Sequence, residues 1–94
     1  MPTDLEAGLT LRVDGVVWRE VDDELVVLEV DTGMYLNLNG SATVLWGALT
    51  TVATGSGLVS LLIERYGIPA EQAEADVQSF LGMLKEHSLL QLVG

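Results

Sequence analysis

The sequence predicts an α+β fold in which a three-stranded antiparallel sheet is followed by three helices. Two observations carry this prediction. Between Val16 and Leu38 the chain is rich in β-branched residues and is interrupted by short polar turns, whereas after Asn39 the apolar residues recur at helical spacing. Because the strands come before the helices, an alternating α/β sheet is not expected. We interpret residues 1–94 as a single domain whose first residues, 1–8, form a flexible lead-in.

The expected strands span residues 16–21, 25–30 and 34–38. Polar residues at 22–24 and 31–33 separate them, and Gly33 is free to adopt a positive φ in the second turn. The middle strand carries apolar residues on both faces, which is typical of a central strand. An earlier segment, residues 9–13, is expected to be a short strand or an extended approach to the sheet.

The expected helices span residues 42–49, residues 58–66 and a segment from Pro69 to about His87. Asn39 or Ser41 could cap the first helix with a side-chain oxygen. Residues 50–57 are rich in Thr, Gly and Ser and are interpreted as a connection. Proline is tolerated in the first turn of a helix, so Pro69 indicates where the third one begins. The apolar tail, residues 89–93, is expected to pack as an extended segment.

The charge of the chain excludes several classes of partner. Four basic residues face fourteen acidic ones, which gives a formal net charge of −10. Such a chain is not expected to bind nucleic acid or an anionic membrane surface, whereas a basic partner would be attracted. The same charge could serve solubility alone. The chain has no cysteine, and neither a signal peptide nor a membrane-spanning run is apparent, so we expect a cytoplasmic protein.

Residues that could perform covalent chemistry are nearly absent. His87 is the only histidine, and no cysteine accompanies it to complete a usual zinc site. The acidic run at residues 22–24 lacks the spacing of a calcium loop, and the glycines do not form a phosphate-binding loop. No serine has a nearby base in the sequence other than His87. We therefore expect no catalytic residue, no metal site and no cofactor, and hence not an enzyme.

A docking edge is the alternative to an active site. The third expected strand runs directly into the first helix, and no later strand is available to pair with its far side. On the third helix Asp76 and Met83 lie in one line with Ala73 and Phe80. Met83 could form an adaptable binding surface or could simply fill a gap in the core.

Two motifs in this order resemble a known family. Leu38-Asn39-x-x-Ala42-x-x-Leu45-Trp46 is followed by Ala75-Asp76-Val77-x-x-Phe80-Leu81-x-x-Leu84 and a closing Leu89-Leu90. This pattern resembles the PqqD-like family, the RiPP recognition elements of ribosomal-peptide biosynthesis, over residues 16–92. Residues 50–57 depart from the shorter turn that is usual in the family. The resemblance implies a winged-helix-like PqqD fold.

The resemblance also implies a function. Members of the family bind the leader of a precursor peptide as a strand beside their third strand, against their third helix, and deliver it to a modifying enzyme. Carried over to this chain, the peptide-binding residues would be Met34, Tyr35, Leu36, Asn37, Leu38, Ala73, Asp76, Val77, Phe80 and Met83. We expect Leu36→Pro to abolish strand pairing and replacement of Arg12 to have little effect.

The implied partners are the leader peptide, which could carry Lys or Arg, and a separate enzyme. Size and acidity favour a stand-alone protein that works with a leader peptidase in lasso-peptide biosynthesis. The alternative is a PqqD-type chaperone that presents a peptide to a radical SAM enzyme. A winged-helix regulator and a structural subunit are less favoured, because the charge of −10 opposes contact with DNA and the edge favours a peptide.

Overall fold

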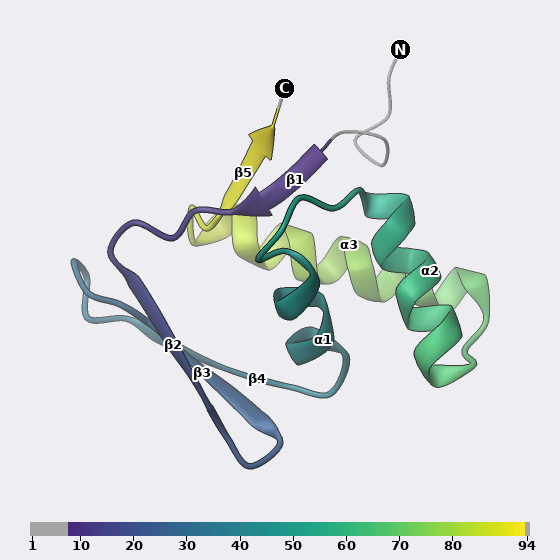
Figure 1. The fold of residues 1–94 in the computed structure, drawn as a ribbon, viewed down its shortest axis with the longest axis horizontal. Coiled ribbons are helices and arrows are strands. Elements are labelled where there is room, and N and C mark those ends of the chain that lie inside the picture. Colours follow the sequence, from purple (N-terminus) through teal and green to yellow (C-terminus); the bar gives the residue numbers. More distant parts are fainter. Residues whose placement is uncertain (1–7, 94) are drawn as a thin grey trace.

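The computed structural model describes residues 8–93, with the side chain of Asn39 excepted, so residues 1–7 of the predicted lead-in lie outside the described part. The elements are β1 (Gly8–Leu11), β2 (Val16–Val21), β3 (Glu24–Glu29), β4 (Tyr35–Asn39), α1 (Ser41–Ala48), α2 (Gly55–Tyr66), α3 (Ala70–Glu86) and β5 (Leu90–Val93) (Figure 1). The predicted α+β fold, a three-stranded antiparallel sheet followed by three helices, is confirmed. None of these helices is long and apolar enough to cross a membrane.

Strand β3 is the central strand of the larger sheet, as predicted, and the order is β2-β3-β4. Leu25 and Val27 of this strand point into the core and are 3% and 1% exposed. The opposite face is not covered, because Leu28 is 36% exposed. The apolar residues on both faces of β3 therefore indicated its central place in the sheet, but only one of its faces is buried.

Helix α1 packs on the inner face of this sheet, and α2 and α3 add much of the remaining core, which also contains Leu9 and Leu11 of β1 and Leu89 (Figure 1). The fully buried side chains of the helices include Leu45, Trp46, Leu58, Leu62, Ala73, Val77 and Leu84. Trp46 of α1 contacts the sheet through Trp18 of β2, with ring centroids 5.4 Å apart and the rings edge to face at 72°. This packing fixes α1 between the sheet and α3.

Two predicted boundaries are wrong for reasons of capping. Helix α2 begins at Gly55, because the Thr54 side chain accepts a hydrogen bond from the Gly57 N–H at 3.0 Å, so the connection ends three residues earlier than predicted. Helix α1 begins at Ser41, one residue earlier than predicted, so Ser41 lies within the helix and is not its N-cap, while the side chain of Asn39 is outside the described part. The N-cap of α1 is Gly40 at φ 56°, a conformation that favours glycine.

The two ends of the described chain form a second sheet. Strand β1 pairs antiparallel with β5, and Leu9 also makes a bridge with Ala53 of the α1–α2 connection. Arg12 joins this sheet to the larger one, because its guanidinium contacts Glu29 at 3.2 Å and donates to the carbonyl oxygens of Ser88 and Asp14. The sequence predicted extended segments at both ends but did not indicate that they pair with each other.

Candidate functional site

The hydrogen bonds of β3 alternate between its two neighbours. The Glu29 N–H donates to the Met34 carbonyl oxygen at 2.8 Å, on the side of β4. The next residue, Val30, donates to the Gly15 carbonyl oxygen at 2.8 Å, on the side of β2. Since antiparallel ladders alternate residue by residue, odd-numbered residues of β3 direct their backbone groups toward β4.

This alternation sets the direction of every backbone group in β4. The register pairs Leu36 and Leu38 with odd-numbered residues of β3, so their N–H and C=O groups face the sheet. The N–H and C=O groups of Tyr35 and Asn37 consequently point away from it. Strand β4 has no neighbour on that side among residues 8–93. It therefore presents a free edge to which an extended peptide can be added.

The side chains of β4 alternate in the same way. Leu38 is buried at 6% exposure and Leu36 is half-buried against the core. Tyr35 is 64% exposed and Asn37 is also exposed. The edge thus has one face continuous with the core and one face in solvent.

Met34 lies outside the strand, contrary to the predicted range of residues 34–38. Its N–H donates to Thr32 Oγ1 at 3.2 Å, and its carbonyl oxygen accepts the hydrogen bond from Glu29. Both backbone groups are therefore already used in the β3–β4 turn. The 44% exposed side chain is the part of Met34 that remains available to a ligand.

Three of the site residues proposed on α3 are core residues. Ala73 and Val77 are fully buried, and Phe80 is 6% exposed. In this packing the three side chains lie beneath the surface of α3 and are not accessible to a ligand. The physical reason is that Ala73, Val77 and Phe80 belong to the buried stripe of α3, together with Leu84, whereas Asp76 and Met83 lie at the border of that stripe.

Asp76 and Met83 lie on the accessible flank of α3. Met83 is half-buried and packs against the core, so it fills a gap and also reaches the surface. Asp76 is half-buried and lines an open hollow of about 230 Å³. The other residues that line this hollow are Ser41, Tyr66, Ile68 and Gln72. The hollow lies where the starts of α1 and α3 meet the end of α2.

Sequence reasoning missed these four neighbours of Asp76. Gln72 precedes Asp76 by four residues and so shares its helix face, a spacing that could have identified it. Tyr66 closes the expected helix over residues 58–66 and is 43% exposed. Ser41 was considered only as a cap. Their meeting depends on how three helices pack, and no local pattern encodes that arrangement.

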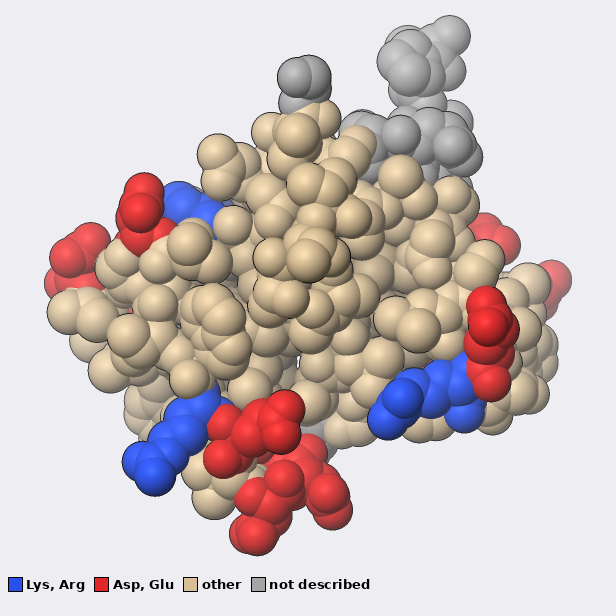
Figure 2. All heavy atoms as spheres, viewed as in Figure 1, with Lys and Arg blue, Asp and Glu red and all other residues tan. Residues whose placement is uncertain are grey.

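Charge is distributed unevenly around the site. The stretch from residue 32 to residue 63, which includes β4 and α1, contains no charged residue. Acidic side chains gather instead around the β2–β3 turn, at the bottom of the view in Figure 2. Within residues 8–93 no group of three or more His, Cys, Asp or Glu residues could hold a metal ion. The arrangement offers backbone pairing and side-chain contacts to a ligand.

Comparison with known proteins agrees with this geometry. Residues 24–90 match the family model "Coenzyme PQQ synthesis protein D (PqqD)". No curated protein matches the chain in sequence. Two solved structures are similar in fold. One is "TbiB1 in Complex with the TbiA(beta) Leader Peptide", at 28% identity and a TM-score of 0.78 over 87% of this chain and 94% of that one.

The other is "Lasso peptide synthetase B1 complexed with the leader peptide", at 23% identity and a TM-score of 0.77, over 88% of this chain and 96% of that one. At this identity the second likeness concerns the fold alone. The family match spans β3, β4 and all three helices, which are the elements that build the free edge and the flank of α3. The chain therefore belongs to the PqqD family.

Proposed function

We propose that this chain is a non-catalytic adaptor that binds the leader region of a ribosomally made precursor peptide and delivers it to a processing enzyme. The observation that carries the proposal is the free, uncharged edge of β4, where the N–H and C=O groups of Tyr35 and Asn37 point away from the sheet. The flank of α3 around Asp76 and Met83 would supply side-chain contacts.

Strand addition accounts for affinity without any reacting group. Each backbone hydrogen bond contributes about 0.5–1.5 kcal/mol net, and ordering a flexible peptide offsets part of that gain. Anchoring side chains must therefore supply the surplus. Half-buried Leu36 and Met83 are apolar surfaces where such anchors could pack. Among the proposed residues, we assign backbone pairing to β4, side-chain contact to Asp76 and Met83, and support to the buried residues of α3.

The solved structure at 28% identity supports the nature of the ligand, because it is a complex with a leader peptide. The structure of lasso peptide synthetase B1 agrees in fold. We propose a separate leader peptidase of a lasso-peptide pathway as the partner enzyme, with presentation to a radical SAM enzyme as the alternative. The expected cytoplasmic location and the absence of a cofactor remain part of this proposal.

The proposal is tested with the leader peptide of the precursor encoded beside the gene of this chain. Fluorescence anisotropy of the labelled leader should show saturable binding, whereas the core part of the same precursor should not bind. Leaders that carry a single N-methyl group should lose binding at every second position across the paired segment, because only alternate peptide N–H groups face β4. Failure of the unmodified leader to bind would remove the proposed function.

A further inference from the structure

The hollow beside Asp76 collects polar side chains that have no partner among the described residues. Ser41, Tyr66, Gln72 and Asp76 come from three helices and line the same space of about 230 Å³. None of them makes a side-chain hydrogen bond or ion pair within residues 8–93. Polar groups that converge without pairing to each other are typical of a ligand subsite.

The hollow lies near the end of β4, the strand beside which the peptide is proposed to bind. Ser41 follows the last residue of β4 by two positions, and β4 turns into α1 on the side of the molecule where α2 and α3 lie (Figure 1). A strand paired with β4 that continues past Asn39 therefore reaches Ser41 and then the flank of α3. The subsite would receive a side chain of the same peptide.

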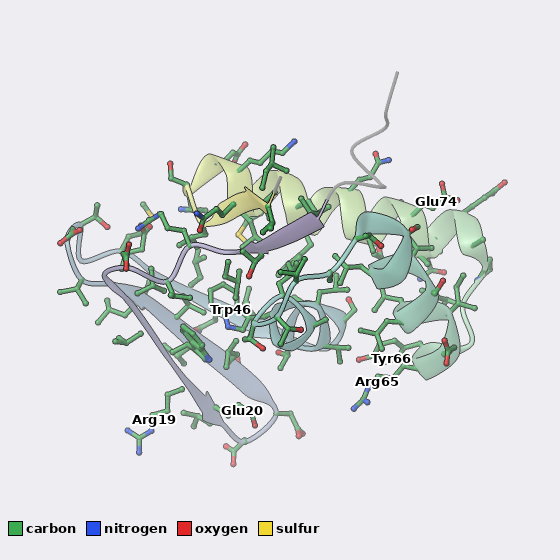
Figure 3. All side chains as sticks on the ribbon, turned by 45° about the horizontal axis from the view of Figure 1, so that its top comes forward. Arg19, Glu20, Trp46, Arg65, Tyr66 and Glu74 are labelled. Carbon is green, nitrogen blue, oxygen red and sulfur yellow. The ribbon has the colours of Figure 1, made fainter. Side chains whose placement is uncertain are left out.

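The charge of the hollow selects a cation. Asp76 is half-buried, and the one ion pair found within residues 8–93 joins Arg12 to Glu29, so no basic side chain neutralises it. Arg65 precedes Tyr66 in the last turn of α2, but its guanidinium extends outward from the end of that helix (Figure 3). A ligand that brings a positive charge would form a charge-assisted hydrogen bond in a partly desolvated place.

An apolar side chain would fit the hollow less well. It would cover the Asp76 carboxylate without offering a donor, which costs free energy. A Lys or Arg side chain satisfies both requirements, since its aliphatic stem can pack on Ile68 and the ring of Tyr66 while its end reaches the carboxylate. We propose, on the basis of the proposed function, that this hollow is the subsite for one Lys or Arg of the leader, held by Asp76 and by the Gln72 amide.

The test measures coupling between Asp76 and the leader. Synthetic cognate leaders in which each Lys or Arg is replaced singly by Met are titrated into the parent chain and into Asp76→Asn. Asp76→Asn should weaken binding of the parent leader about ten-fold. One of the Met-substituted leaders should bind the parent chain about ten-fold more weakly than the parent leader does. The same leader should bind Asp76→Asn with the affinity that the parent leader has for that variant.

Glu74→Gln is the matched control, because it removes one charge from the same helix. Glu74 is exposed and points to the side of α3 away from Tyr66 (Figure 3). It should change binding by less than about two-fold. Thermal unfolding of each variant shows that the fold is kept.

The outcomes separate the subsite from the proposed function. If the parent chain binds no leader, the proposed function fails. If the leader binds but Asp76→Asn has no effect, or if its effect adds independently to that of every basic residue, the cation subsite is wrong. A cognate leader without Lys or Arg, or a coupling to Tyr or Trp of the leader in place of a basic residue, would overturn it as well.

Discussion

The larger sheet has two edges without a neighbouring strand in the described part of the chain, and they differ in what lies on them. The β2 edge carries Arg19 and Glu20, which point into solvent near the tip of the hairpin (Figure 3). The β4 edge carries no charged residue and continues into α1. Charged side chains on an edge strand oppose pairing with another chain. Free backbone groups alone therefore do not define the site.

The two edges also differ in the helical surface that lies beside them. Trp18 of β2 faces inward and packs against Trp46, so the side chain of Trp18 contributes to the core. Strand β4 ends beside the hollow, where α1, α2 and α3 meet around Asp76. A peptide on β4 would have helix surface to contact beyond its own strand. The candidate site therefore combines an uncharged strand edge with an adjoining helical surface.

Proline substitution compares the two edges most directly. Asn37→Pro should weaken leader binding about 100-fold, because it removes an outward N–H of β4 and blocks close approach of the peptide. Glu20→Pro, which removes the equivalent outward N–H of β2, should leave the affinity within about two-fold. Anisotropy titration measures both, and circular dichroism confirms the fold. Equal losses from the two variants would contradict the assignment to β4.

The position of this proline differs from the one expected from sequence. Leu36→Pro was expected to test strand pairing, but the N–H of Leu36 faces β3. Proline there would break the ladder of the protein itself, and a loss of binding would then report unfolding of β4. Asn37 is the informative position because its N–H points outward.

Removal of Trp18 should change stability and not recognition. Trp18→Ala loses the edge-to-face contact with Trp46, and because Trp18 is 38% exposed the free energy of unfolding should fall by about 2 kcal/mol. Val17→Ala, on the exposed face of the same strand, should cost less than about 0.5 kcal/mol. Urea denaturation measures both values. A large loss of leader affinity in folded Trp18→Ala would place the β2 edge in the site.

The fold was predictable to the extent that local patterns encode it. The alternation in residues 16–38 and the helical spacing after Asn39 gave the strands, the helices and the central place of β3. The cap at Thr54 was missed because a Thr followed by Gly-Ser-Gly has the composition of a loop. The β1–β5 pairing was missed because it joins the two ends of the chain, and no short-range pattern specifies such a contact.

The candidate site was predictable only where it depends on contacts that are close in sequence. The free edge is such a case, because β2, β3 and β4 are consecutive strands joined by short turns. Which side chains of α3 reach the surface depends on the angle at which α3 packs, and so Ala73 and Val77 are core residues while Asp76 lines a hollow. The strand boundary at Met34 was missed by one residue, because the β3–β4 turn uses both of its backbone groups.

Replacement of Arg12 is expected to have little effect on peptide pairing, and the structure gives this residue a separate role in joining the two sheets. Arg12→Met keeps the aliphatic stem and removes the contacts with Glu29 and with the carbonyl oxygens of Ser88 and Asp14. The pair is partly exposed, so the free energy of unfolding should fall by only about 1 kcal/mol. Arg19→Met, without a partner among residues 8–93, should have no measurable effect on urea denaturation. Equal stability of the two variants would contradict the role of Arg12.

The smallest expected effect concerns the acidic β2–β3 turn. Asp22→Asn combined with Asp23→Asn removes two charges, and asparagine tolerates the φ of 57° found at position 22. If the leader is basic and pairs only with β4, these charges act at a distance. Its association rate at low salt should fall about two-fold, and its dissociation rate should stay constant. Stopped-flow measurements at low and high salt resolve the two rates, and the difference should vanish at high salt because screening removes it. A faster dissociation would mean that the turn touches the bound peptide, and the two edges would then belong to one site.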